Sequence, residues 1–399
     1  MTQEDSGKPL FDGKLRYCVR CCIPTTNEGM QFDELGICLA CRSSEEKMHI
    51  NWVERQKQLK EILEQYKAKA GSNYDCIIPI SGGKDSAFQL HILTKVYGMK
   101  PLAVTFSHNL YSKTGWYNLW NIIEKFNVDH IMFTLNRDLI NRLMKQSLKG
   151  IGDPCWHCHI GVGSFPLKVA VKFNIPLIIW GESIAEGTGR ATYFNPVMEF
   201  NRDYFVKQSA RLYPDQMVSD TVSKKDIDTL QLPSVEDIEK VGVVGIHLGD
   251  FIFWDTERQV EFLKKEYAWK EDVVEGSYKG YKSVECIMEG MHSYTKFLKR
   301  GFGRASDHAS QDVRAGLLTR EEGFELAKRY DTERPDVMDY LLKQTNLTED
   351  EFNEIMKDHR EKHLGKQGIT EKEFWDAVKN YQKKSRVDKS KELYLNNLD

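Results

Sequence analysis

The feature that most constrains this chain is a Gly-rich hexapeptide, SGGKDS at residues 81–86, where a short apolar run meets a helical pattern. The run before it, YDCIIPI, has the composition of a strand buried on both faces. The pattern after it, AFQLHILTKVYG, predicts a helix that ends at its glycine. Backbone N–H groups at a helix start carry partial positive charge and suit a phosphate. The hexapeptide therefore predicts an anion-binding loop between a buried strand and a helix.

Strand and helix patterns alternate after this loop. Further strands are predicted at KPLAVTF, VDHIMFTL and IPLIIWGES, with helical patterns between them at GWYNLWNIIEKFN, RDLINRLMKQSLK and IGVGSFPLKVAVKFN. Strands that alternate with helices of this length predict βαβ units and a parallel sheet covered on both faces. We place this doubly wound α/β domain at residues 72–200.

The rest of the chain differs from this domain in composition. It divides into a cysteine-rich ribbon at 1–45, a linking helix at 46–71, a substrate-site extension at 201–314 and a helical C-terminal region at 315–399. The extension is less regular and contains one possible strand, VGVVGIHLG. The charged residues at the end of the chain are expected to form a frayed tail.

Charge and hydropathy exclude several classes of function. Lys and Arg total 56 against 59 Asp and Glu, a net charge of -3, so no strong global field attracts nucleic acid or an anionic membrane. The polar start is unlike a signal peptide, and no apolar run approaches the roughly 20 residues of a spanning helix. We therefore expect a cytoplasmic protein without membrane insertion.

The first cysteines have the spacing of a metal site. Cys18 and Cys21 form one C-x-x-C pair, and Cys38 and Cys41 form a second pair 16 residues later. Two such pairs predict a four-cysteine zinc ribbon. A closed set of four thiolates leaves no position for substrate, so we expect a structural Zn²⁺. Unbonded buried thiols are the alternative.

The spacing S-G-G-x-D-S resembles the PP-loop of ATP pyrophosphatases, the adenine nucleotide α-hydrolase group with HUP-like domains. The resemblance implies ATP cleavage between the α and β phosphates, with Lys84 and Asp85 in catalytic roles. A carboxylate beside phosphates needs a cation such as Mg²⁺. A Gly-rich turn that only joins strand to helix is the alternative. The residues expected to bind the nucleotide are Ser81, Gly82, Gly83, Lys84, Asp85, Ser86, Ser107, His108, Gly181 and Glu182.

A second cysteine group follows at PCWHCHI, which contains Cys155 and Cys158. Such a pair is compatible with a redox, persulfide-forming or metal-binding role, or with no role at all. Cys286 would add a third thiolate if the fold brought it close, and three cysteines resemble the [4Fe–4S] arrangement of some tRNA-thiolating PP-loop enzymes. His157 and His159 remain candidates for ligands, substrate contacts or plain loop residues.

Cationic and acid/base candidates lie further along the chain. The segment KRGFGRASDH contains Arg300, Arg304, Asp307 and His308, which we expect to bind a substrate carboxylate because Arg matches carboxylate geometry. A basic surface loop is the alternative. Glu285 and His292 are candidates for acid/base work.

In order along the chain, the ribbon YCVRCCIPTT, the loop SGGKDS, the pair PCWHCHIG and the segment YKSVECIMEGMHSYTKFLKRGFGRASDHAS resemble the N-acetyl sugar amidotransferase family of the WbpG/PseA type. The resemblance spans roughly residues 15–360. It implies conversion of an acetamido group of an acidic N-acetylated sugar to an acetamidino group, through an adenylated intermediate, with release of AMP and pyrophosphate. This is a C–N ligase reaction of lipopolysaccharide O-antigen or nonulosonic acid biosynthesis.

The same resemblance implies that ammonia comes from a separate HisH-like glutaminase and a HisF-like channel protein. Residue 2 is Thr, so the chain has no N-terminal cysteine nucleophile. The nearest match to a nucleophile elbow, at residues 36–40, uses Cys38, which the ribbon needs. Two rival readings remain: a PP-loop tRNA thiolation enzyme with a cysteine-bound cluster, and a non-catalytic binding module. The net negative charge disfavours the first rival, and the loop disfavours the second.

Overall fold

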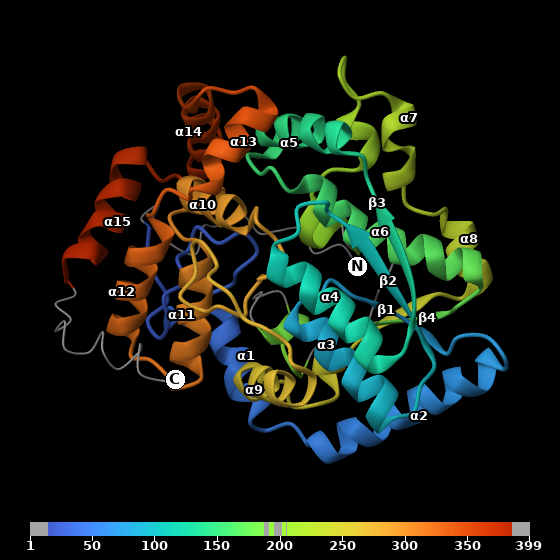
Figure 1. Cartoon of the computed structure of the whole chain (residues 1–399). Helices are drawn as coiled ribbons and strands as arrows, with labels where there is room; N and C mark the ends of the chain where they lie inside the picture. Colours follow the sequence, from blue (N-terminus) through green and yellow to red (C-terminus); the bar gives the residue numbers. More distant parts are fainter. Residues whose placement is uncertain (1–14, 187–190, 195–201, 205, 385–399) are drawn as a thin grey trace.

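The computed structural model of the chain describes residues 15–186, 191–194, 202–204 and 206–384 (Figure 1). Five parallel strands form one sheet in the order β3-β2-β1-β4-β5. The strands are β1 (Cys76–Pro79), β2 (Pro101–Ser107), β3 (Asp129–Thr134), β4 (Leu177–Trp180) and β5 (Val244–His247). Helices cover both faces of the sheet, so the expected doubly wound α/β class is confirmed.

Helices make up most of the remaining regular structure. They are α1 (Leu39–Lys47), α2 (Trp52–Ala70), α3 (Lys84–Leu90), α4 (Lys113–Phe126), α5 (Arg137–Ile151), α6 (Trp156–Phe173), α7 (Lys224–Ile227), α8 (Val235–Val241), α9 (Thr256–Tyr267), α10 (Glu289–Arg300), α11 (Arg304–Arg314), α12 (Arg320–Asp331), α13 (Val337–Thr345), α14 (Glu349–Gly365) and α15 (Glu371–Lys384). Within the described ranges, none of them has the length and apolar character that crossing a membrane requires.

The alternation of side chains along the strands builds one apolar core on each face of the sheet. On one face Ile77 and Val104 belong to a buried cluster that includes residues of α5 and α6. On the other face Ile78 and Ile179 belong to a cluster that includes residues of α3, α4 and α9. The strands are buried on both sides, which explains their continuous apolar runs in the sequence.

Two elements differ from the expected arrangement. The strand β5 pairs with β4, Leu177 opposite Val244, so the sheet extends beyond the boundary that we placed at residue 200. In the described part of the chain between these strands the helices are short, α8 with seven residues among them, so the sequence contained no clear crossover-helix signal. The helix after the Gly-rich loop begins at Lys84 and continues beyond Leu90 as a π-helical segment, His91–Val96.

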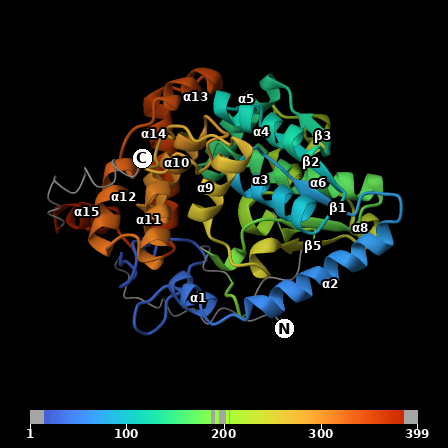
Figure 2. The ribbon, with the colours of Figure 1, turned by 60° about the horizontal axis from the view of Figure 1, so that its bottom comes forward.

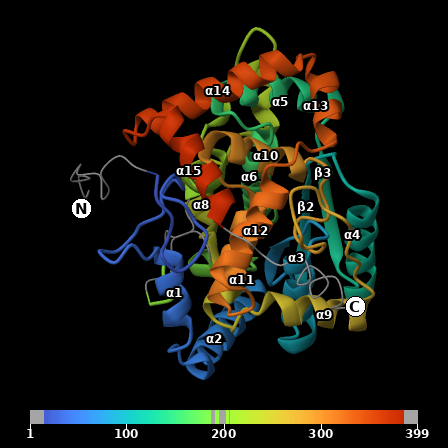
Figure 3. The same cartoon turned by 90° about the vertical axis from the view of Figure 1, so that its left-hand side faces the viewer.

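The C-terminal helices gather over the carboxyl edge of the sheet and against the N-terminal segment. In Figure 2 and Figure 3 the first described residues and α1 lie beside α11 and α12, and α14 lies near α5. Hydrogen bonds join these distant parts, since Cys22 donates its N–H to Ser310 Oγ at 3.2 Å. The helical C-terminal region therefore starts at α10, before residue 315. The expected tail at 385–399 lies outside the described residues.

One backbone contact ties the C-terminal region to the sheet. Ser112 N–H donates to Glu285 O at 3.0 Å, and Ile287 N–H donates to Leu110 O at 3.0 Å. Gly115, in the first turn of α4, permits this approach because a Cβ there would lie 2.4 Å from Glu285 Cα. The neighbouring atoms belong to the backbone of Glu285, so they cannot move aside as a flexible side chain could.

Replacement of Gly115 by alanine tests this contact. We expect Gly115→Ala to lower the free energy of unfolding by about 1–3 kcal/mol, since overpacking against backbone outweighs the gain in helix propensity. The matched control is Gly150→Ala in α5, where the added Cβ would meet only Leu212 Cδ1 at 3.6 Å. The control is expected to be neutral or stabilising by up to about 1 kcal/mol. Equal midpoints of the two variants in chemical denaturation would contradict this account.

Candidate active site

The Gly-rich loop lies at the switch point of the sheet. β1 and β4 are neighbours, while the chain leaves β1 toward β2 and leaves β4 toward β5. In open α/β sheets, ligands bind outside the carboxyl ends of the strands at such a point. Residues 81–86 follow β1 and residues 181–182 follow β4, so both predicted nucleotide-binding segments meet there.

The loop is held open by its own side chains. Gly82 has φ of +89°, and a Cβ there would lie 2.8 Å from Leu119 N. Ser81 Oγ accepts the N–H of Gly83 at 3.2 Å, and Ser86 Oγ donates to Gly83 O at 2.9 Å. Only glycine combines this backbone conformation with such close packing. The sequence thus fixes a turn that presents backbone to a ligand.

A polar cavity of about 450 Å³ opens in front of the loop. Charged groups from the loop, from the end of β4, from the 281–285 segment, from α10 and α11 and from the N-terminal segment face it. The charged side chains that line this polar cavity are Glu28, Lys84, Asp85, Glu182, Lys282, Glu285, Lys296, Arg304, Asp307 and Arg314.

Opposite charges surround the loop. Lys84 Nζ lies 2.6 Å from Asp85 Oδ1, and the Lys84 side chain is buried. Burial favours the neutral form of each group, but Lys84 and Lys282 lower the pKa of Asp85, while Asp85 and Glu182 raise the pKa of Lys84. Both groups therefore stay charged.

Lys282 is a cation of the polar cavity that no carboxylate contacts within ion-pair distance among the described residues. Its Nζ donates to Gln311 Oε1 at 3.2 Å, and within the described part of the chain it forms no ion pair. Burial, with the nearby Lys84 charge, lowers the pKa of Lys282 to about 8. An anionic ligand with several oxygens could lie close to Lys282 and balance its positive charge.

Glu285 stands between the polar cavity and a second cavity. Its Oε1 accepts from Ser81 Oγ at 3.3 Å, whereas Oε2 is buried without a hydrogen-bond partner. Burial, with the charges of Glu289 and Asp85, raises the pKa of Glu285. A carboxyl with a buried free oxygen and a raised pKa holds a proton more readily than an ordinary glutamate, so it is a candidate for proton exchange with a ligand.

The second cavity, of about 340 Å³, is lined by the three cysteines of the second group. The fold thus brings Cys286 to the same cavity as Cys155 and Cys158, which spacing alone did not establish. Burial raises the pKa of Cys158 to about 12 and raises the pKa values of the other two thiols further. We call it the thiol cavity; it shares with the polar cavity Ser81, Asp85, Ser86, Ser283, Glu285 and Arg304.

Most of the residues singled out from the sequence line one of these cavities. They are Ser81, Gly83, Lys84, Asp85, Ser86, His108, Cys155, Cys158, Glu182, Cys286, Arg304, Asp307 and His308. Gly82, Ser107, Gly181 and Arg300 do not appear in the lining of either. Arg300 is buried and its guanidinium lies 2.7 Å from Glu28 Oε2, so it braces the wall instead of facing the cavity.

Several cavity residues escaped the sequence analysis, among them Lys282, Lys296 and Arg314. Lys282 lies only three residues before Glu285, and its position in YKSVEC was the available signal. Lys296 and Arg314 lie on amphipathic helices, where a lysine or arginine looks like an ordinary surface residue.

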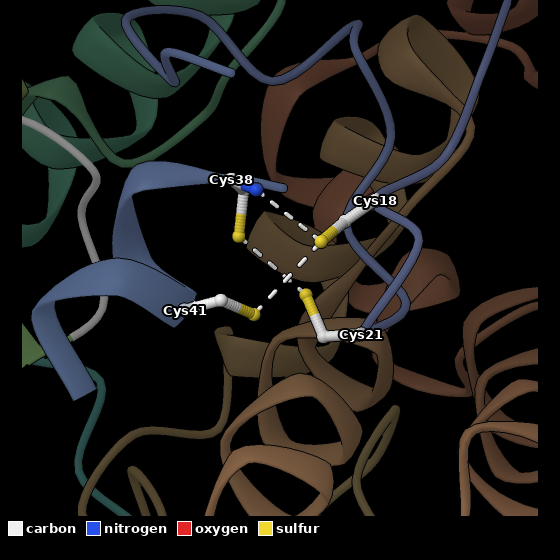
Figure 4. Close-up of side chains that lie close together, drawn as sticks. All are labelled: Cys18, Cys21, Cys38 and Cys41. Carbon is white, nitrogen blue, oxygen red and sulfur yellow. Dashed lines mark hydrogen bonds between the residues drawn. The ribbon is translucent and has the colours of Figure 1, made fainter. Parts of the chain in front are cut away.

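The four ribbon cysteines meet as their spacing predicted (Figure 4). Cys18 Sγ lies 3.8 Å from Cys41 Sγ, and Cys21 Sγ lies 3.6 Å from Cys38 Sγ. Four thiolates around one zinc ion at about 2.3 Å would lie about 3.8 Å apart. The buried sulfurs therefore fit a tetrahedral metal ion, which would link the two ends of the ribbon.

The ribbon is joined to the site by hydrogen bonds. Arg320 of α12 donates to the carbonyl oxygens of Cys18 and Cys21 at 2.8–3.1 Å. Thr26 Oγ1 donates to Arg300 O at 2.5 Å, and Glu28 reaches the polar cavity. The ribbon therefore forms part of the cavity wall.

A parallel doubly wound sheet with an S-G-G-x-D-S loop at its switch point is the arrangement that the resemblance to the PP-loop group leads us to expect. Further along the chain, residues 275–367 match the family model described as LPS biosynthesis protein WbpG-like, C-terminal domain. Residues 275–367 are thus similar to the WbpG-like C-terminal domain, and this matched segment supplies the 281–285 segment, α10 and α11 to the cavities.

Two further similarities accompany this match. An uncharacterised protein of Methanocaldococcus jannaschii, MJ1599, is 29% identical over 168 residues, which span 42% of this chain and 59% of that protein. NMN synthetase from Francisella tularensis is similar at a TM-score of 0.26 and 14% identity, covering 54% of this chain and 87% of that one. Neither similarity identifies a substrate.

Removal of one ribbon thiolate tests the metal assignment. We expect Cys38→Ser to lose the ribbon metal and to lower the free energy of unfolding by about 3 kcal/mol or more, because metal binding contributes directly to folding. Cys22→Ser is the control, since Cys22 is buried beside the ribbon but donates to Arg320 O at 3.6 Å and does not join the four. Metal content by mass spectrometry and thermal unfolding check both; an unchanged metal content in Cys38→Ser would refute the assignment.

The pKa of Lys282 predicts a pH dependence of anion binding. Lys282 is charged below its pKa of about 8 and neutral above it, so affinity for inorganic pyrophosphate should fall as the pH rises above about 8. One proton is involved, so the loss is at most about tenfold per pH unit. Lys282→Arg, charged throughout, should flatten the profile, while Lys60→Arg on the exposed face of α2 should not. Calorimetric titrations with superimposable profiles for wild type and Lys282→Arg would exclude this role of Lys282.

Proposed function

We propose that this protein is an ATP-dependent amidotransferase that forms AMP and pyrophosphate and converts the acetamido group of an acidic N-acetylated sugar into an acetamidino group. The observation that carries the proposal is the Gly-rich loop at the sheet switch point, which opens on a cavity whose far wall is the WbpG-like domain. The loop suits phosphates, and the WbpG-like domain belongs to lipopolysaccharide biosynthesis by its description. Nonulosonic acid biosynthesis would use the same chemistry.

The polar cavity supports placement of the triphosphate. The N–H groups at the start of α3, with Lys84 and Lys282, would bind the phosphates and the departing pyrophosphate. The carboxylate oxygens of Asp85 fit a hard cation, and Mg²⁺ carried with ATP would offset the phosphate charge when bound. Desolvation raises the pKa values of Glu182 and Glu285, so both carry less negative charge than exposed glutamates, which favours anionic ligands here.

The chemistry divides into two steps. The acyl oxygen of the acetamido group attacks the α-phosphorus, a P–O bond forms, and the bond to pyrophosphate breaks. Ammonia then attacks the imidate carbon, the C–O bond to AMP breaks, and one proton leaves the new amidine. Glu285, at the junction of the two cavities, is positioned to accept that proton.

The cations of the polar cavity and the raised pKa values of the cavity thiols support our proposals for the sugar and for the ammonia source. Lys296, Arg304 and Arg314 lie along the polar cavity and suit a substrate carboxylate. A glutaminase would need a cysteine activated by a lowered pKa, whereas burial raises the pKa values of the cavity thiols. We therefore propose that a separate HisH-like glutaminase and a HisF-like channel protein deliver ammonia, and that no nucleic acid takes part.

Three cysteines at one cavity favour a second candidate, tRNA thiolation. That reaction also uses ATP and releases AMP, but it requires a tRNA acceptor and a sulfur donor. Retention of tRNA at low salt, together with AMP formation that depends on tRNA, would favour thiolation over sugar amidation.

Turnover assays test the amidotransferase. The protein is incubated with ATP, Mg²⁺, an ammonium salt and acidic N-acetylated sugars; we expect AMP and pyrophosphate, and a product in which oxygen has been replaced by NH in the mass spectrum. Asp85→Asn should lower kcat by about 100-fold or more, because the Mg²⁺ that accompanies ATP would lose the carboxylate that binds it. The circular dichroism spectrum should be unchanged. Asp129→Asn, whose carboxylate accepts from Tyr74 on the protein surface, is the control. Formation of ADP and orthophosphate would eliminate the proposed mechanism.

A further inference from the structure

A second group of potential metal ligands lies at the wall of the thiol cavity. Asp153, His159 and His292 each offer a ligand atom, and these atoms lie within 4.8 Å of one another. In the described part of the chain only the ribbon cysteines form another such group, and Cys155, Cys158 and Cys286 do not. The three residues come from three places: the turn after α5, the first turn of α6 and the first turn of α10.

The positions of these side chains are defined by their neighbours. Asp153 Oδ1 accepts the N–H of Cys155 at 2.9 Å, which fixes the carboxylate at the start of α6. Its two oxygens lie 3.1–3.2 Å from His292 Nδ1, and the rings of His159 and His292 are 5.1 Å apart. Ligand atoms around one zinc ion lie about 3–3.5 Å apart, given bonds of about 2.0–2.2 Å. Small side-chain rotations would therefore close this group around an ion.

The group is accessible from the cavity. His159 and His292 line the thiol cavity, and the Asp153 and His292 side chains keep 15% and 24% of their surface exposed. A fully enclosed ion pair would not retain this access. The group thus has both converging donors and a route for an ion.

The charges around this group have other partners. Lys299 is directed elsewhere, since its Nζ donates to Ile151 O at 3.0 Å. Arg211 lies 3.0 Å from Glu28, and the nearby carboxylate of Glu289 is paired with Arg304 at 2.6 Å. Apart from its hydrogen bond to the N–H of Cys155, the Asp153 carboxylate faces the two imidazoles.

We propose that Asp153, His159 and His292 bind a divalent transition-metal ion, with Zn²⁺ as the best match, and leave at least one coordination position open to the thiol cavity. Two imidazoles and one carboxylate suit zinc and its neighbours, whereas Mg²⁺ and Ca²⁺ prefer oxygen ligands. Three protein ligands are the pattern of zinc sites that keep a position for water or substrate. The ribbon, with four ligands, is closed, so the two sites differ in kind.

Metal counting on the full-length protein tests this proposal. Each protein is first loaded with Zn²⁺ and then dialysed against metal-free buffer, which removes unbound ion. We then expect two zinc ions per wild-type chain by mass spectrometry, and one in Asp153→Asn and in His292→Gln. The matched controls are Asp129→Asn and His91→Gln. His91 resembles the candidate ligands because it is partly buried and its Nδ1 forms a hydrogen bond of 2.8 Å with Tyr267 Oη. Both controls should keep two. Thermal unfolding shows whether each variant is folded. If Asp153→Asn or His292→Gln is not folded, His159→Gln takes its place in the metal count.

A variant of a nearby thiol distinguishes metal binding by Asp153 and the histidines from metal binding by the cysteines. Cys158→Ser should keep two zinc ions if the ligands are Asp153 and the histidines, and should lose one if the thiols hold the metal. Co²⁺ substitution separates the sites, because only thiolate ligands give strong charge-transfer absorption, which should persist unchanged in His292→Gln. One zinc ion in the wild type, two in His292→Gln, or iron and sulfide lost together in Cys158→Ser would each overturn the proposal.

Discussion

The structure depends on one backbone contact, between residues 110–112 after β2 and residues 285–287 before α10. Two hydrogen bonds of 3.0 Å and a glycine in α4 bring the WbpG-like domain against the carboxyl edge of the sheet. Without this contact the loop at 81–86 would face solvent, and phosphates bound there would compete with water at high dielectric. With it, Lys282 and Glu285 are carried to within reach of the loop, and the two cavities share a wall.

This arrangement explains why the site contains so many buried charges. Lys84 with Asp85 and Arg304 with Glu289 are close pairs that satisfy each other. Lys282 and Glu285 are different, because the first has no carboxylate partner within the described residues and the second keeps one buried oxygen without a hydrogen bond. Leaving such groups uncompensated costs stability. A bound ligand would remove this cost, which is why our proposed function assigns a charged substrate and a proton transfer to these two residues.

The sequence predicted the local features of this protein well and the long-range ones poorly. The strands from β1 to β4 and the Gly-rich turn between β1 and α3 were predictable because each depends on neighbours a few residues apart, and the four-cysteine group was predictable because its two C-x-x-C pairs have a characteristic spacing. The strand β5 was separated from β4 by irregular chain, so its place in the sheet was not. Arg300 and Arg304 looked alike in the sequence, yet one braces Glu28 and the other lines the cavities, since only packing decides which way a helix end turns. Asp153 and His292, separated by 139 residues, could not be paired at all.

The four-cysteine ribbon contributes to the wall of the candidate active site. Its thiols lie away from the loop, but the segment that follows them supplies Ile23, Asn27 and Glu28 to the polar cavity. Glu28 there faces Arg300, Arg211 and His363, which come from three different parts of the chain. A flexible N-terminal segment could not hold a carboxylate among these groups, because the entropy of ordering it would have no compensation. A metal ion bound by the four cysteines would hold the ribbon in place and would therefore also hold this wall of the polar cavity in place.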